Sequence, residues 1–552
     1  MKMASQYNYN DKKILIVDDQ RAFQVMLKAM LQNFGAADIH FANTGEAAVQ
    51  ACRKHHFDIL LVDYNLGTGK NGGQLLEELR VRKLLKVDAL YFIISGDNNK
   101  SMVLSALEME PDEFIAKPFS QFQLHNRLAR AHAKRQSLKD VLSELMDKNY
   151  PRVITQAQRH IEAGTRYKSY CQNLIIEAQI LTGKLDDAKA GLQAMLKERN
   201  QTWAQAKLGQ VQLLQHEHQE AIKTLKATLS QSPLLMMAHD WLARAYWKDG
   251  QLEQAMETAQ QACKMAAFSI ERQQLLADIA VEAGEQRIAK ETFAIILNLA
   301  RRSVHRGPRH LCNYIRSLID EAQAEDDLYR KNRLLHEVNT VLFHARREEG
   351  RDESFDFDAF EGISQARVHA TKGELNKAKR VLFDSNEQYL STPDQVSNEL
   401  LPDTFLTLNS VGEYEYAMPF AEELKSREGL DKSSLRSAQS VLEDENFELK
   451  VGQFREFNKM GIECYEDGRF QEAVSYFDKA LQVAPGNTGA ILNKIQAILK
   501  LLVNNDKDLR LQLASECKHT IKLLDGLKLN TNHAERYVTL KRDFEQVVKG
   551  KM

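Results

Sequence analysis

The sequence predicts two regions of different fold class: a doubly wound α/β domain with a five-stranded parallel sheet, and an all-α array of helical repeats. Two observations support this division. Up to about residue 133, short apolar runs alternate with amphipathic stretches, as in the strand–helix units of a parallel sheet. Beyond residue 136 the strand pattern is absent, and small residues recur every 34 positions, as in stacked helix pairs.

The strands of the first region are predicted from apolar runs of strand length. Runs such as Ile14–Val17 and Ile59–Val62 are continuously apolar, as expected for strands covered by helices on both faces. Amphipathic stretches such as Arg21–Phe34 and Gly45–Lys54 are predicted to be those helices. The predicted strands are Ile14–Val17, Asp38–Phe41, Ile59–Val62, Leu90–Ile94 and Phe114–Ala116.

Polar side chains follow four of these strands directly. Asp18 and Asp19 follow the first strand, and Asp63, Ser95 and Lys117 follow the third, fourth and fifth. Ligands of such sheets bind at the carboxyl ends of the strands, so we expect these side chains to meet there. Three neighbouring carboxylates repel one another unless a cation neutralises them, and hard oxygen ligands suit Mg²⁺.

This set of residues predicts a site that accepts a phosphoryl group. Asp63 would be the nucleophile, while the metal ion and Lys117 would neutralise the phosphoryl oxygens and Ser95 would donate a hydrogen bond to one of them. Taken singly, an Asp-Asp turn, a Ser-Gly turn or a Lys-Pro loop is more often structural than functional. Their order at successive strand ends favours the functional interpretation.

These residues and spacings resemble the receiver domain of bacterial two-component response regulators, which has a flavodoxin-like fold. The resemblance covers roughly residues 11–133 and rests on the segments KKILIVDDQ, LLVDYNL, FIISGD and DEFIAKPF. The gaps are 44 residues from Asp19 to Asp63 and 22 residues from Ser95 to Lys117.

The resemblance implies a role for each residue of the site. Asp63 would be the phosphoacceptor, and a sensor histidine kinase would be the donor. Ser95 and Phe114 would form a switch pair, in which Ser95 moves toward the phosphate and the aromatic ring turns inward. The implied Mg²⁺ ligands are Asp18, Asp19, Asp63 and the backbone carbonyl of Asn65.

The loop after Asp63 departs from the family pattern. The family usually has a proline soon after the acceptor, whereas NLGTGKNGG has an apparent one-residue insertion and four glycines. We expect this loop to change the access of water or of a kinase. The acid–lysine set is intact, so we expect the acceptor chemistry to be retained.

The second region resembles tetratricopeptide repeats. Ala221, Ala255 and Ala289 lie 34 residues apart, as do Gly250 and Gly284. A glycine allows the turn between helices, and an alanine five residues later allows two helices to cross closely. The best unit, residues 456–489, matches the family at Gly461, Gly468, Ala473, Phe477, Ala480 and Pro485.

The sequence predicts six segments. Residues 134–165 are predicted to extend the last receiver helix into the array. The stretch REEGRDESFDFDAFEG is predicted to be a charged, exposed connection between two helical blocks. The segments are the receiver at 11–133, linker helices at 134–165, repeats at 166–345, the connection at 346–362, a second helical block at 363–535 and a carboxyl-terminal helix or tail at 536–552.

Composition limits the partners and the compartment. The net charge is −2, from 74 basic and 76 acidic residues, so no general field favours nucleic acid or an anionic membrane. The basic stretch Arg301–His310 is predicted to be a solvated loop between helices. Apolar runs are too short to span a bilayer, Met1–Lys13 lacks the apolar core of a signal peptide, and the six cysteines form no CxxC pair. We therefore expect a cytoplasmic protein with reduced, partly buried thiols.

The function expected from these features is a response regulator of a phosphorelay whose output is protein binding. The repeats would bind a protein or peptide partner, and the chain would not be an enzyme beyond its own phosphorylation and dephosphorylation. The alternative is a phosphate sink or inhibitor that competes with another regulator for a shared kinase. A hidden catalytic output ranks lower, because the helical region shows no nucleophile–base pair and no phosphate-binding glycine loop. An inert scaffold is disfavoured, because no key residue is missing.

Overall fold

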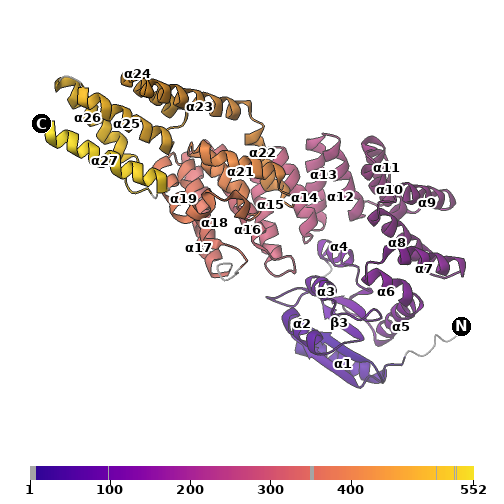
Figure 1. Ribbon diagram of the computed structural model, residues 1–552. Coiled ribbons are helices and arrows are strands. Elements are labelled where there is room, and N and C mark those ends of the chain that lie inside the picture. The colour runs from indigo at the N-terminus through magenta and orange to yellow at the C-terminus, as the bar shows by residue number, and fades with distance from the viewer. Residues whose placement is uncertain are drawn as a thin grey trace. The chain divides into compact units, whose positions relative to one another are not determined.

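The computed structural model describes residues 8–551, apart from 97–98, 349–353, 505–506, 528 and 530 (Figure 1). The chain forms two compact units. The first runs up to Ala283 and includes Ala294–Arg306, and the second contains Gly284–Phe293 and the chain from Gly307 onward. The division therefore falls within the first predicted helical block and not at the connection after residue 345.

The α/β domain is a five-stranded, all-parallel sheet in the order β2-β1-β3-β4-β5, as the sequence predicts. Each predicted strand is present, with ends that differ by one residue at most. Because β1 lies between β2 and β3, the chain reverses its direction across the sheet there, which opens a crevice at the carboxyl ends of β1 and β3. The strands are β1 (Lys13–Val17), β2 (Asp38–Ala42), β3 (Ile59–Asp63), β4 (Leu90–Ser95) and β5 (Glu113–Ala116).

Two apolar layers cover the sheet, one on each face. Successive side chains of a strand point to opposite faces, so Ile14 and Ile16 join one layer and Leu15 and Val17 the other. All four are fully buried, and burying such a side chain contributes roughly 1.5–3 kcal/mol. The first layer includes α1 (Arg21–Asn33) and α5 (Gln121–Ser137); the second includes α2 (Gly45–Lys54), α3 (Gly72–Val81) and α4 (Lys100–Glu108).

The sequence predicts that residues 134–165 extend the last receiver helix. The structure shows that this helix ends early, at Ser137. Helix α5 ends at Ser137, and Leu138 leaves helical geometry with φ −116° and ψ 18°. The reason is packing: Leu138 is fully buried in a cluster with Val141 and Val153. Three separate helices share this cluster: α6 (Lys139–Met146), α7 (Tyr150–Glu162) and α8 (Lys168–Leu181).

The remaining helices of the first unit pack as consecutive pairs. Gly209 shows why a small residue is needed where they cross, because a Cβ there would lie 2.5 Å from Cγ of Leu225 on the next helix. Gly250 has φ +80° in the turn between two helices, a conformation that favours glycine. These helices are α9 (Leu185–Glu198), α10 (Thr202–Leu214), α11 (His218–Gln231), α12 (Met236–Lys248), α13 (Leu252–Met265) and α14 (Ile270–Glu282), and α15 (Gln286–Ala300) spans both units.

The second unit is helical in its described residues. A Cβ at Gly461 would lie 2.5 Å from the ring of Phe477, so the repeat glycine again permits a close crossing. The last helix begins before the predicted boundary at residue 535. The elements are α16 (Pro308–Ala324), α17 (Leu328–Glu348), α18 (Phe357–Thr371), α19 (Leu375–Leu390), η1 (Pro393–Gln395), α20 (Leu401–Ser410), α21 (Tyr414–Ser426), α22 (Lys432–Leu442), α23 (Glu445–Glu466), α24 (Phe470–Val483), α25 (Thr488–Asn504), α26 (Lys507–Lys522) and α27 (Thr531–Lys551).

The predicted exposed connection is partly wrong. Residues 349–353 lie outside the described residues, but Phe355, Phe357 and Phe360 are buried together. The ring centroids of Phe355 and Phe357 lie 5.5 Å and 5.9 Å from that of Phe360. Aromatic pairs at such distances add to the free energy of burial, so this end of the segment is a packed start of α18.

All six cysteines lie in the described part of the chain, where they are buried and form no disulfide. The thiols were expected to be partly buried, and the structure buries all six. No helix among the described residues is both long and apolar enough to cross a membrane.

Candidate functional site

The acidic residues predicted to meet do lie together at the carboxyl ends of β1 and β3. Val17 is paired with Val62 in the sheet, so the residues that follow them, Asp18 and Asp63, are neighbours. One carboxylate oxygen from each of Asp18, Asp19 and Asp63 lies within 4.8 Å of the others. Asp18 is 1% exposed and Asp63 6% exposed, whereas Asp19 is open to solvent.

Lys117 supplies the positive charge of this site. Its Nζ lies 3.0 Å from Oδ2 of Asp18 and 2.7 Å from Oδ2 of Asp63. The ammonium also lies 3.6 Å from the centroid of the Phe23 ring, a cation–π contact that the sequence analysis missed. Phe23 lies in the first turn of α1, the helix that follows the acidic pair. This position was the only indication in the sequence that its ring would reach the site.

The backbone of Asp18 is held by a buried glutamine that no motif indicated. Gln24 donates from Nε2 to the backbone oxygen of Asp18 at 2.7 Å and to Oδ1 of Asn43 at 2.8 Å. The backbone N–H of Gln20 donates to Oδ1 of Asp18 at 2.8 Å. These bonds fix the acidic turn at the end of β1.

The charges of the site are suited to a divalent cation. Burial raises the pKa of Asp63, and the hydrogen bond and charge of Lys117 act against this effect. Three carboxylates face one ammonium, so a further positive charge would stabilise the full set. Carboxylate oxygens are hard ligands of the kind that Mg²⁺ prefers, so the three that converge here fit this ion.

The other predicted residues surround this cluster. Ser95 is buried at the end of β4, with its Oγ 3.9 Å from Sδ of Met102, and Phe114 on β5 is half-buried against the second apolar layer. Asn65 is exposed, and its N–H donates to Oδ1 of Asp63 at 3.1 Å. The roles of Ser95 and Phe114 as a switch pair, and of the Asn65 carbonyl as a ligand, stay predictions.

The glycine-rich loop after Asp63 is anchored in its middle. The Nζ of Lys70 lies 3.4 Å from Oε2 of the buried Glu78, and the Lys70 N–H donates to Oε1 of Glu46 at 3.1 Å. Asn71 then caps α3 and forms a reciprocal capping box with Gln74. The loop is thus tied to both α2 and α3.

Gly72 brings the start of α3 against the acceptor strand, and we predict that Gly72→Ala destabilises the receiver. A Cβ at this position would lie 2.7 Å from the backbone oxygen of Asp63 and 3.1 Å from Cα of Tyr64, and neither backbone atom can move freely. We expect a loss of about 2 kcal/mol, measured by hydrogen exchange of β3 amides in the full chain. Gly452→Ala is the control, because no atom lies within 4 Å of its Cβ position. Equal exchange in the two variants would contradict this prediction.

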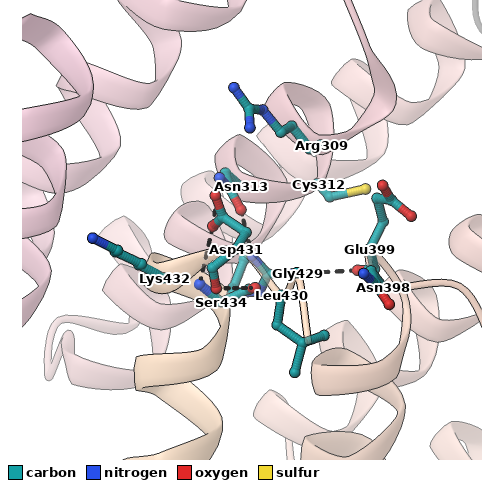
Figure 2. A pocket seen from close by; sticks show the side chains of 11 residues that line it. Arg309, Cys312, Asn313, Asn398, Glu399, Gly429, Leu430, Asp431, Lys432 and Ser434 are labelled. Atoms are coloured by element: carbon teal, nitrogen blue, oxygen red, sulfur yellow. Dashed lines mark hydrogen bonds between the residues drawn. The ribbon is translucent and has the colours of Figure 1, made fainter. Parts of the chain in front are cut away.

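A cavity of about 320 Å³ lies in the second unit (Figure 2). Two of its charged groups, Asp431 and Arg316, are engaged within the chain. Asp431 accepts from Nδ2 of Asn313 at 3.0 Å and from the N–H of Ser434 at 3.2 Å, where it caps α22. Arg316, which also lines it, is bound by Asp403. The receiver cluster, in which acids converge on one edge, is therefore the stronger candidate.

Comparison with known families agrees with this site. The family described as response regulator receiver domain matches residues 14–129, and the family described as tetratricopeptide repeat matches residues 238–268. The second match covers most of α12 and all of α13, which follows it.

Curated relatives match the same amino-terminal region. The transcriptional regulatory protein YvrH of Bacillus subtilis is 31% identical over 122 residues, which are 22% of this chain and 49% of YvrH. The chemotaxis protein CheY-3 of Vibrio cholerae is 28% identical over 116 residues, 21% of this chain and 88% of CheY-3. The chain thus spans about half the length of YvrH and most of CheY-3.

Solved structures are similar over parts of the chain. The chemotaxis response regulator CheY4 of Vibrio cholerae is 21% identical, with 22% of this chain and 98% of that chain covered and a TM-score of 0.20. A structure titled MamA RS-1 ArsTM double mutant is 22% identical, with 29% of this chain and 90% of that chain covered and a TM-score of 0.26.

Fold, site and family together define the class of the two regions. Residues 14–129 form a receiver domain of the kind found in two-component response regulators. An all-helical region with tetratricopeptide repeats follows it in the same chain.

Proposed function

We propose that this chain is a response regulator that accepts a phosphoryl group on Asp63 from a sensor histidine kinase, with Mg²⁺ bound. One observation carries this proposal: Lys117 bridges Asp18 and Asp63 at the sheet edge, with Asp19 beside them. An acid cluster of this kind with one lysine positions and neutralises a phosphoryl group, which is most of what this transfer requires.

The proposed transfer forms one bond and breaks one. A carboxylate oxygen of Asp63 attacks phosphorus and forms a P–O bond, while the P–N bond to the kinase histidine breaks. The electron pair of that bond stays on the imidazole nitrogen, which then takes up a proton. Bound Mg²⁺ would supply charge neutralisation for the phosphoryl oxygens, and its proposed ligands are Asp18, Asp19, Asp63 and the Asn65 carbonyl.

Three residues would communicate the phosphorylated state. Lys117 would move from its contact with Asp63 to an oxygen of the phosphoryl group, and Ser95 would rotate from Met102 to donate to another oxygen. The space that Ser95 leaves would allow the Phe114 ring to turn inward. The output would be binding of a protein partner by the repeats, with no catalysis other than that of the receiver on its own phosphoryl group.

Phosphorylation of Asp63 is tested directly with a small-molecule donor. Acetyl phosphate and Mg²⁺ should add one phosphoryl group to the full-length protein, measured by intact mass, and Asp63→Asn should gain none, because an amide is not a nucleophile here. Chelation of the metal should prevent the modification of wild type. Asp58→Asn is the control, since Asp58 binds Lys86 at the other end of β3. Equal modification of wild type and Asp63→Asn would refute the proposal.

A further inference from the structure

One face of the receiver contacts helical repeats within the same compact unit. The contact has two parts. In the first part α4 lies against the junction of α13 and α14. In the second, the start of α3 and the loop before it contact the segment Ala294–Arg306. The receiver segments involved are those that follow Ser95 and Asp63 in the chain.

Arg272 is the centre of the first part. Its side chain is 2% exposed and donates from Nε and NH2 to the two carboxylate oxygens of Asp240 at 2.7 Å. It also donates to Glu108 of the receiver, from NH1 at 3.1 Å and from NH2. Asp240 by itself neutralises Arg272, so Glu108 is an additional acid that can leave without creating a buried, unpaired charge.

An apolar contact and a backbone contact accompany this ion pair. Ser101, Leu104 and Glu108 are spaced so that they share one face of α4. The N–H of Ala267 donates to Oγ of Ser101 at 3.3 Å. Leu104 packs on a small apolar cluster whose buried members are Met236, Ala262 and Ala266.

The second part of the contact is polar. Gln74 donates to the backbone oxygen of Leu299 at 3.2 Å, and Nε2 of His305 lies 2.7 Å from Oε1 of Glu77. Arg302 reaches the backbone oxygen of Gly69 at 3.5 Å. Residues 301–307 form the loop between α15 and α16, and its basic side chains are exposed, as expected, although Arg302 and His305 also contact the receiver. A contact made of one leucine and several polar pairs resembles a transient interface more than a fused core.

We propose that the Arg272 surface, formed by Met236, Asp240, Ala262, Ala266 and Arg272, is a binding site for an acidic amphipathic helix. Helix α4 fills this site in the unphosphorylated chain. Phosphorylation of Asp63 releases α4, and a partner helix with a leucine and a carboxylate four residues apart then takes its place. The release step rests on the function proposed above.

The connection between the acceptor and this site is short. Ser95 Oγ contacts Met102, which is adjacent in α4 to Ser101, and Ser101 bonds to the repeats. A displacement of Ser95 toward a phosphoryl group therefore acts on the first turn of α4. Glu108 and Leu104 lie further along the same rigid helix, so the whole contact face moves with that turn.

Release is tested in the full-length protein with a charge reversal at the receiver side. Glu108→Lys places a cation beside Arg272, and we expect about tenfold faster hydrogen exchange at residues 262–275 without any phosphoryl analogue. Glu257→Lys is the matched control. It makes the same change of charge at an exposed position of α13, the helix in which the measured residues begin. Glu77→Lys tests the second part of the contact independently. Beryllium fluoride with Mg²⁺ should accelerate the same amides in wild type and leave Asp63→Asn unchanged.

The outcomes separate this inference from the proposed function. If the analogue protects the end of β3 in an Asp63-dependent manner but residues 262–275 do not respond, the release is refuted and the phosphoacceptor function stands. If the analogue does not bind at all, the proposed function fails, and Glu108→Lys still decides whether α4 is docked. If residues 262–275 exchange no faster in Glu108→Lys than in Glu257→Lys, the docking of α4 on the repeats is refuted.

A peptide tests the chemistry of the occupant. A labelled peptide with the sequence of residues 99–110 should bind the Glu108→Lys protein about tenfold more tightly than wild type, whose site is filled. The same peptide with lysine in place of Glu108 should bind neither protein. Equal binding of both peptides would refute recognition of the acid by Arg272.

Discussion

Lys117→Met is expected to destabilise the receiver by about 3 kcal/mol at pH 8 in the absence of divalent cations. The substitution keeps the apolar stem and removes the ammonium that contacts both Asp18 and Asp63. Two nearly buried carboxylates then repel each other, with backbone N–H donors but no cation beside them. The lysine side chain is itself 17% exposed, which limits the loss to the lower end of the range for buried ion pairs.

The loss should depend on pH and on metal. Burial already raises the pKa of Asp63 above its value in an unfolded chain, and Lys117 opposes this effect. Removing Lys117 raises the folded-state pKa further, so stability is retained at low pH and lost as the pH rises through that value. The variant should therefore be closer to wild type at pH 5, and Mg²⁺ should restore part of the loss at pH 8.

The measurement is hydrogen exchange of β1 and β3 amides in the full chain, with chelator or Mg²⁺ present. Amide exchange reports the stability of the receiver alone, which a single unfolding curve of a protein with two units does not. Lys28→Met, on the exposed side of α1, is the control. Equal exchange of the two variants at pH 8 in chelator would show that Lys117 does not stabilise the acid cluster.

Asp403→Ala is expected to destabilise the second unit by about 4 kcal/mol. Asp403 is 6% exposed and accepts from Nε and NH2 of Arg316 at 3.1 and 2.6 Å, and from NH1 of Arg367 at 2.5 Å. Both arginines are about as buried as the acid. Its removal leaves Arg316 without an acidic partner, whereas Arg367 retains Asp320 at 2.8 Å. An uncompensated buried guanidinium is the main cost.

Exchange of amides in α16, α18 and α20 measures this loss, because these helices carry the three side chains. Asp403→Asn keeps an acceptor oxygen and should lose less. Asp326→Ala, at an exposed site, should be neutral. If Asp403→Ala exchanged like Asp326→Ala, the network would contribute nothing to stability.

The fold and the site of the receiver were predictable because the residues that define them lie next to one another in the sequence. Each strand is a short apolar run, and each functional side chain directly follows one, so Asp18, Asp63 and Lys117 could be assigned from neighbouring residues. The roles of Gln24 and Phe23 were missed, because a glutamine or a phenylalanine is common in helices and neither belongs to a recognisable motif. Their roles depend on which strand ends they reach after folding.

The helical region was predictable in kind but not in its boundaries. The 34-residue period identified helix pairs, since each unit repeats the same crossing at a small residue. The end of α5 at Leu138 had no glycine or proline to mark it, and the buried Phe355 stood in a stretch dominated by charge. The pair formed by Arg272 and Glu108 joins residues 164 positions apart, a separation that no local pattern encodes.

The six buried thiols give the chain an internal reporter of opening. The thiolate is the reactive form of cysteine, and burial raises the pKa of Cys52, Cys263 and Cys517 to about 12. In the folded protein, alkylating reagents therefore meet few thiolates and little accessible sulfur. Because the six residues lie on six different helices, from α2 to α26, the order in which they react with such a reagent follows the order in which those helices come apart.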